Sequence, residues 1–105
     1  MNRTYIGIDN GVTGSIGVIT PTGEYYFYKT PVESKQDYTK KKKNISRVIP
    51  GEFLSIIGGY PNRKAIIERP MVNPTRFTAT ISAARCLEAT LIILESIGIP
   101  YEFVD

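Results

Sequence analysis

The sequence has no histidine and a single cysteine, Cys86, among its 105 residues. Within these residues, a zinc site built from cysteine and histidine is therefore excluded. An internal disulfide and the catalytic triads that use a histidine base are excluded for the same reason. Any catalysis by this chain must use carboxylates, hydroxyls, lysines or a hard cation held by oxygen ligands.

We also find no long apolar stretch and no targeting signal in the sequence. No apolar run approaches the roughly 20 residues of a membrane span. The first four residues, Met1-Asn2-Arg3-Thr4, lead into a strand rather than a secretory signal. We therefore expect a cytoplasmic protein. A composition with 42% hydrophobic and 22% charged residues is typical of a globular chain, and the length predicts one domain.

The net positive charge of the chain is small, but the basic residues are unevenly distributed. The net charge is +3, yet six of the thirteen basic residues fall within residues 35–47, where Asp37 is the one acid. Such a segment suits a polyanion such as nucleic acid, although a solvated loop explains it equally well. Because residues 30–46 are polar and lack apolar periodicity, we expect a mobile loop there. Its candidate phosphate contacts are Lys40, Lys41, Lys42, Lys43 and Arg47.

The pattern of apolar runs and turn formers predicts an α/β fold. Strands are expected at residues 5–9, 16–19 and 24–29, joined by short turns as an antiparallel meander. A helix should begin at Pro50 and end at Gly58-Gly59, followed by a strand at 64–68. A long helix over 75–97, stopped by Gly98, then leads to a strand at 101–104. The order β-β-β-α-β-α-β predicts a mixed five-stranded sheet with helices packed on it.

Two carboxylates, Asp9 and Glu68, each close an apolar strand. Taken singly, Asp9 could cap a turn, and Glu68 could form an ion pair with Arg69 or Arg3. Together they are the ligands that magnesium or manganese prefers. Since neighbouring strands lie about 4.8 Å apart, carboxylates on adjacent strands can reach one ion. We therefore expect Asp9 and Glu68 to lie side by side and to bind a divalent cation.

The basic residues near Glu68 and the long helix add two further expectations. Arg69 and Arg76 flank the connection after Glu68, where they could hold a DNA backbone. The helix over 75–97 carries few charges, and its apolar residues cover more than one face. One face can pack on the sheet, and the second predicts a homodimer through this helix. Alternatively, a segment absent from these 105 residues covers the second face.

Several short motifs resemble RuvC-type Holliday-junction resolvases. These are YIGIDNGVTGSIG at residues 5–17, AIIE at 65–68, NPT at 73–75 with the alanine-rich helix after it, and IPYEFV at 99–104. The resemblance implies an RNase H-like fold and a homodimer. It also implies magnesium-dependent nicking of four-way DNA junctions, with Asp9 and Glu68 in the first two metal-ligand positions.

The sequence departs from that family after the last expected strand. Such nucleases complete their metal site with one or two acidic residues on a later helix, and these residues end at Asp105. We therefore expect an N-terminal part of a longer RNase H-like domain, without its C-terminal helix and with weak or no activity.

Two alternatives remain open at the level of sequence. The pattern Asp9-Asn10-Gly11-Val12-Thr13 also resembles the first hairpin of ATP-binding domains of the actin and sugar-kinase superfamily. A non-catalytic module that binds nucleic acid through the lysine segment is the other. Binding of branched DNA, as opposed to ATP, separates the nuclease from the kinase-like alternative. Loss of DNA cleavage when Asp9 and Glu68 are removed separates the nuclease from the simple binding module.

Overall fold

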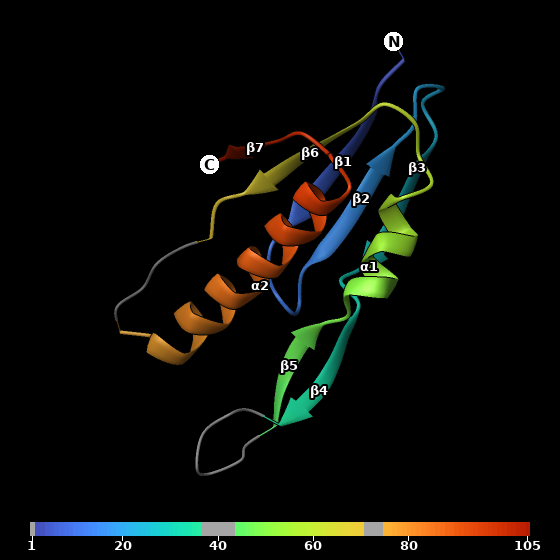
Figure 1. The fold of residues 1–105 in the computed structure, drawn as a ribbon. Helices are drawn as coiled ribbons and strands as arrows, with labels where there is room; N and C mark the ends of the chain where they lie inside the picture. The colour runs from blue at the N-terminus through green and yellow to red at the C-terminus, as the bar shows by residue number, and fades with distance from the viewer. Residues whose placement is uncertain (1, 37–43, 71–74) are drawn as a thin grey trace.

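The computed structural model describes residues 2–36, 44–70 and 75–105. Its first three strands are β1 (Thr4–Asp9), β2 (Ser15–Ile19) and β3 (Tyr25–Lys29). Two further strands, β4 (Val32–Gln36) and β5 (Asn44–Val48), precede helix α1 (Pro50–Ile57). Strand β6 (Arg63–Glu68), helix α2 (Phe77–Ser96) and strand β7 (Tyr101–Val104) complete the chain, as Figure 1 shows.

The first three strands and the last two form one mixed sheet. Its order is β3-β2-β1-β6-β7, with antiparallel pairs among β1, β2 and β3 and parallel pairs from β1 to β6 and from β6 to β7. A parallel pair needs a crossover connection, and α2 supplies the one between β6 and β7. The predicted five-stranded mixed sheet and its antiparallel meander are confirmed.

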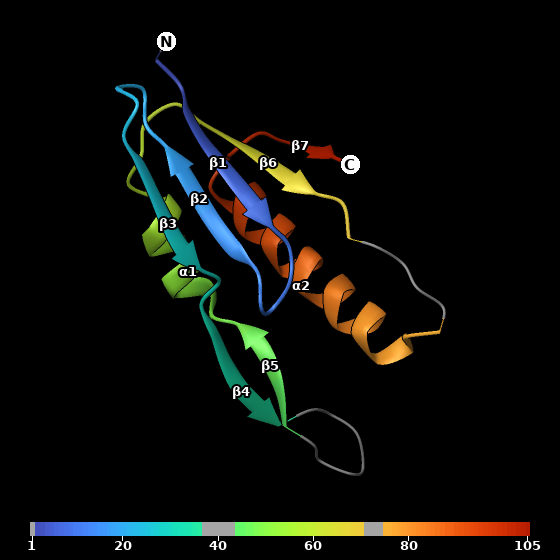
Figure 2. The same cartoon turned by 180° about the vertical axis from the view of Figure 1, so that it is seen from behind.

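Both helices cover the same face of this sheet. Figure 1 shows α1 and α2 in front of the strands, and Figure 2 shows the strands unobstructed from behind. Alternation along each strand sends one set of side chains toward the helices, where they are removed from water. The core contains Ile6, Ile8, Ile16, Val18, Val48, Phe53, Ile57, Ala65, Ile67, Cys86, Ile93, Leu94 and Ile99.

The ends of the helices follow the predicted signals. Pro50 occupies the first turn of α1, and Gly58 follows its last residue. Gly98 adopts a φ of 71°, and the backbone N–H of Ile99 donates to the carbonyl of Leu94 at 2.9 Å. A glycine with positive φ is the usual way to end a helix, because it carries no Cβ that would clash. The predicted start at residue 75 is two residues early, since α2 begins at Phe77.

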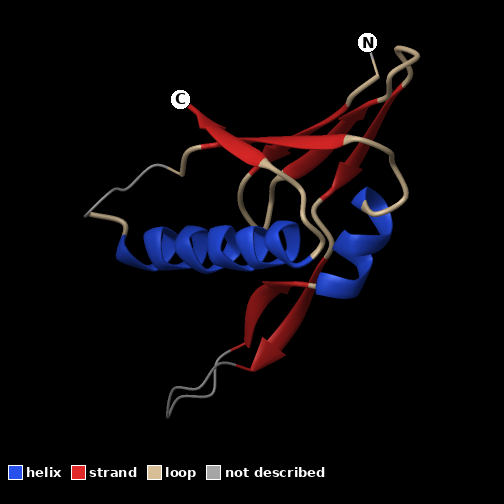
Figure 3. Cartoon of the chain, turned by 45° about the horizontal axis from the view of Figure 1, so that its top comes forward, coloured by secondary structure: helices blue, strands red, loops and turns tan. Residues whose placement is uncertain are grey.

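The expectation of a mobile loop over residues 30–46 is wrong for the residues that the structure describes there. Strands β4 and β5 pair antiparallel from Val32↔Val48 to Gln36↔Asn44 and form a separate two-stranded sheet. The N–H of Ile49 donates to the carbonyl of Pro31 at 2.9 Å, which joins the two strands at their base. Figure 3 shows this β4–β5 hairpin projecting from the side of the molecule that carries the helices. Its connection, residues 37–43, lies outside the described residues.

Helix α2 is more apolar than we expected for any single segment. An 18-residue stretch of this 20-residue helix has a mean hydropathy of 1.5. By length and composition alone, α2 could therefore cross a membrane. The expectation that no segment approaches this size therefore fails for α2. In the structure the buried residues of α2 are Cys86, Thr90, Ile93 and Leu94, and 22% of its apolar stretch is buried.

Candidate metal site and nucleic-acid contacts

The parallel pairing of β1 and β6 brings the two candidate ligands to equivalent positions. Ile8 pairs with Ile67, and Asp9 and Glu68 follow them as the last residues of their strands. Because Ile8 and Ile67 are buried beneath the helices, alternation directs the next residue of each strand to the opposite face. Asp9 and Glu68 are both exposed. They therefore lie at the ends of adjacent strands on the face of the sheet that the helices leave open.

No basic side chain neutralises this acid pair within the described residues. Arg69, which follows Glu68, instead makes an ion pair with Asp105 at 2.9 Å from Nε to Oδ1. Its guanidinium also lies over the ring of Phe103, 5.3 Å from the centroid. Among the described residues, the side chains of Asp9 and Glu68 form no ion pair and no hydrogen bond. Two unpaired, exposed carboxylates on adjacent strands are free to bind a cation.

The turn after Asp9 is held close to the strand by glycine. A Cβ at Gly14 would collide with the carbonyl oxygen of Asp9, so no other residue fits there without a shift of the backbone. The N–H of Gly14 donates to the carbonyl of Gly11 at 3.0 Å, and Thr30 donates to the carbonyl of Gly14 at 3.1 Å. The turn between β1 and β2 is thus compact, and it fixes the backbone that carries Asp9.

Asn10 anchors the same turn to helix α2. Its Nδ2 donates to the backbone carbonyl of Ala83 at 3.1 Å, across 73 positions of sequence. Its buried Oδ1 has no hydrogen-bond partner among the described residues. An unpaired buried oxygen is costly, so Asn10 is a residue with a structural or functional reason to be polar. No local sequence signal indicates this role of Asn10, because its contact with Ala83 depends on tertiary packing.

The donor set fits a hard divalent cation in kind but is small in number. Carboxylate oxygens suit magnesium and manganese, and exposure leaves room for the water ligands that magnesium retains. No cluster of three or more acidic, cysteine or histidine side chains that could hold a metal occurs in residues 2–36, 44–70 and 75–105. Asp9 and Glu68 therefore place two exposed carboxylates at the ends of adjacent strands, with no third acidic side chain grouped with them among the described residues.

Two polar residues that sequence analysis missed share the row of Asp9 across the sheet. Asp9 pairs with Ser15 on β2, and Ser15 pairs with Lys29 on β3. At a strand spacing of about 4.8 Å, Lys29 lies two strands, or roughly 10 Å, from Asp9. The Lys29 side chain is exposed and has no ion pair among the described residues. In the sequence, Lys29 stands only at the end of an aromatic strand. That position does not reveal how β1, β2 and β3 are aligned with one another.

The other predicted basic contacts lie in different parts of the fold. Arg47 is exposed on β5, and Arg76 directly precedes α2, on the far side of the connection from Arg69. Lys40, Lys41, Lys42 and Lys43 lie outside the described residues. Arg69 and Arg76 lie at the two ends of the connection between β6 and α2, and Arg47 belongs to the separate hairpin.

The fold resembles that of a known DNA-processing protein. No protein-family model matches the sequence, and no curated protein matches it. Among solved structures, T. thermophilus RuvC in complex with a Holliday junction substrate superposes with a TM-score of 0.64 at 16% sequence identity. The match covers 97% of this chain and 64% of that chain. These 105 residues therefore have a RuvC-like, RNase H-like fold.

Proposed function

We propose that this chain is part of a magnesium-dependent endonuclease that acts on branched DNA, with Asp9 and Glu68 as metal ligands. The observation that carries the proposal is the pair of unneutralised carboxylates at the ends of two adjacent parallel strands. The fold likeness to RuvC, whose structure was solved with a Holliday junction, supports this choice of substrate. A cytoplasmic location belongs to the same proposal.

The residues divide the work between cation and phosphate. Asp9 and Glu68 would hold one magnesium or manganese ion through carboxylate oxygens. Such an ion activates an attacking water and stabilises the departing oxygen in phosphodiester cleavage. Lys29, in the same row of the sheet as Asp9, is placed to hold a phosphate near the acid pair. Arg76 and the lysines of residues 40–43 would contact the backbone without reading its sequence.

The engagement of Arg69 lowers its value as a DNA contact in the resting protein. Its ion pair with Asp105 is exposed, however, with 61% and 94% of the two side chains accessible. Exposed pairs contribute only about 0–1 kcal/mol, so a DNA phosphate can replace Asp105 at little cost. We therefore propose that Arg69 contacts nucleic acid by exchanging Asp105 for a DNA phosphate on binding.

A homodimer through α2 belongs to the same proposal. Phe77 and Ile81 are 74% and 41% exposed and lie one turn apart on α2. Ala84 continues that side of the helix at an interval of three residues. This exposed stripe lies away from the buried residues of α2 and is the face on which a second copy would pack.

The metal site can be tested with substitutions that preserve size. Asp9→Asn and Glu68→Gln should each weaken manganese binding measured by calorimetry, because each removes one charged ligand. The same variants should bind a four-way DNA junction nearly as well as the unaltered chain. Any magnesium-dependent nicking should fall below detection. The unaltered chain itself should cleave slowly, because two carboxylates cannot offset the repulsion between two divalent ions.

The matched control is Glu102→Gln, on the neighbouring strand β7. Glu102 pairs with Lys64 at 3.2 Å and is not expected to bind the cation. If Glu102→Gln weakens manganese binding as much as the two site variants do, the cation is held by diffuse negative charge and the proposed site is wrong. Binding of ATP, with no affinity for any DNA junction, would instead favour the kinase-like alternative.

A further inference from the structure

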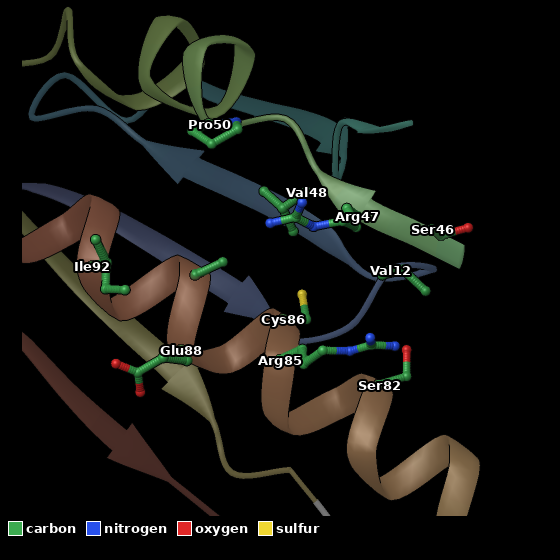
Figure 4. A pocket seen from close by; sticks show the side chains of 11 residues that line it. Val12, Ser46, Arg47, Val48, Pro50, Ser82, Arg85, Cys86, Glu88 and Ile92 are labelled. Atoms are coloured by element: carbon green, nitrogen blue, oxygen red, sulfur yellow. The ribbon is translucent and has the colours of Figure 1, made fainter. Parts of the chain in front are cut away.

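A groove separate from the acid pair lies between the β4–β5 hairpin and helix α2. It has a volume of about 280 Å³, and one wall comes from β5 and Pro50 while the other comes from α2. Val12, in the turn after Asp9, lies between the two walls. Figure 4 shows the lining side chains of all three segments, with Arg47 on β5 and Arg85 on α2 extending in opposite directions along the groove. Asp9 and Glu68 do not line it, because they lie on the open face of the sheet.

Two arginines stand on opposite walls of the groove. Arg47 extends from β5, and Arg85 extends from α2, as Figure 4 shows. Both are exposed, and neither has an ion pair or hydrogen bond to its side chain among the described residues. The one acidic lining residue, Glu88, makes no ion pair with Arg85, and its carboxylate lies at the other end of the groove in Figure 4. The lining of the groove therefore has a net positive charge. Its two guanidinium groups have no partner among the described residues.

The floor of the groove is apolar. Val48 and Cys86 are buried, and Val12 and Ala89 are partly buried and packed against the core. Burial raises the pKa of the Cys86 thiol, so this side chain is uncharged near neutral pH. A floor of small apolar side chains accepts the flat face of a base or a sugar. Guanidiniums provide the forked donors that match phosphate oxygens.

We propose that the β5–α2 groove binds one nucleotide of an unpaired DNA strand. Its phosphate lies between Arg47 and Arg85, and its base or sugar lies against the floor. The choice of DNA rests on the function proposed above, whereas the pairing of a phosphate site with an apolar floor rests on the groove itself. Because Val12 belongs to the turn that follows Asp9, a strand seated here would approach the acid pair along that turn. The groove would thus select DNA that offers a single strand beside a duplex.

The first experiment measures binding of a short fluorescein-labelled oligothymidylate by fluorescence anisotropy, in EDTA and at low salt. Arg47→Gln and Arg85→Gln should each raise the dissociation constant about tenfold, because each removes a charged donor from the proposed phosphate contact. The slope of log affinity against log salt should fall by about 0.7 for each phosphate that is no longer neutralised. Glu88→Gln should tighten binding, because it removes the one negative charge of the lining.

Arg3→Gln is the matched control, because it removes the same charge just before β1, in a residue that does not line the groove. It should change the dissociation constant by less than about twofold. Equal losses of affinity for Arg3→Gln and the groove variants would mean that net charge alone holds the strand, which overturns the proposal. Thymidine monophosphate should compete only at much higher concentration than the oligonucleotide. If it binds as tightly as the strand, the groove is a free-nucleotide site and the proposal fails.

A second variant changes shape without changing charge. Ala89→Leu fills the floor of the groove and should weaken oligothymidylate binding, while affinity for a fully paired duplex stays the same. Circular dichroism and thermal unfolding establish that the variant folds. Unchanged oligothymidylate binding by the folded variant would show that the floor is not used, against the proposal. Since EDTA is present throughout, failure of the proposed metal site cannot change these results, and the two proposals fail independently.

Discussion

Gly14 limits which residues can follow the strand that carries Asp9. A methyl group at this position would overlap the Asp9 carbonyl oxygen, so the Gly14→Ala variant must move the turn or the strand end. We expect a loss of about 1–3 kcal/mol in the free energy of unfolding, as for other overpacked sites. Manganese binding should weaken as well, because Asp9 moves with the backbone. Urea unfolding and calorimetry measure the two effects.

Gly17→Ala provides the comparison for that prediction. Gly17 also lies in the first hairpin, but a Cβ there would meet no atom within 4 Å. Its substitution should change stability by less than about 0.5 kcal/mol, as for ordinary surface positions. Similar losses of stability from the two glycines would show that the close approach to Asp9 is not what the turn requires.

At the scale of single residues, the sequence was informative where chemistry and chain position coincide. Asp9 and Glu68 stood out because each ends an apolar run, and the parallel pairing places them at the ends of neighbouring strands. Lys29 did not stand out, because its relation to Asp9 depends on the register of three strands. The partner of Arg69 was also hidden, since the pairing of β6 with β7 brings Asp105 to it.

At the scale of elements, the missing prediction was the β4–β5 hairpin. Its apolar residues Val32, Ile45 and Val48 are separated by charged and polar residues, so neither strand shows a strict alternation. The pairing of Val32 with Val48 spans a connection that no local turn signal indicated. The helices were predictable because Pro50, Gly58 and Gly98 mark their ends in the sequence itself.

The packing of the segment after α1 onto β3 predicts a response to alkaline pH. A hydrogen bond with Tyr28, together with desolvation, raises the pKa of Tyr60 to about 12. The folded state therefore keeps the Tyr60 proton more tightly than the unfolded state, where the pKa is about 10. The stability that this adds is present below about pH 10 and is lost as the pH rises toward 12.

Tyr60→Phe isolates this contribution from the other tyrosines. The unaltered chain should be more stable than Tyr60→Phe at pH 8, and the difference should shrink between pH 10 and 12. Urea unfolding of both proteins at several pH values gives the comparison. A difference that stays constant over that range would contradict the raised pKa of Tyr60.

At the scale of the whole molecule, the exposed stripe of α2 predicts self-association. Ile81→Glu should convert a dimer into a monomer without loss of stability, because Ile81 is 41% exposed in the single chain. Sedimentation at several protein concentrations measures the oligomeric state. Ile19→Glu is the control, since Ile19 is 52% exposed but lies on β2, in the sheet rather than on α2. An unaltered chain that remains monomeric at high concentration would rule out this interface.

The parallel pairing of β1 with β6 also sets when the acid pair can exist during folding. The hairpin of β1 and β2 closes over a short turn, whereas Ile8 can meet Ile67 only after residue 67 has been made. Closing such a long loop costs more entropy and is slow compared with hairpin formation. A chain emerging from the ribosome therefore carries Asp9 without Glu68 until β6 has been made. The two carboxylates come together only once β6 has paired with β1, so the cation site proposed above would assemble later than the first hairpin.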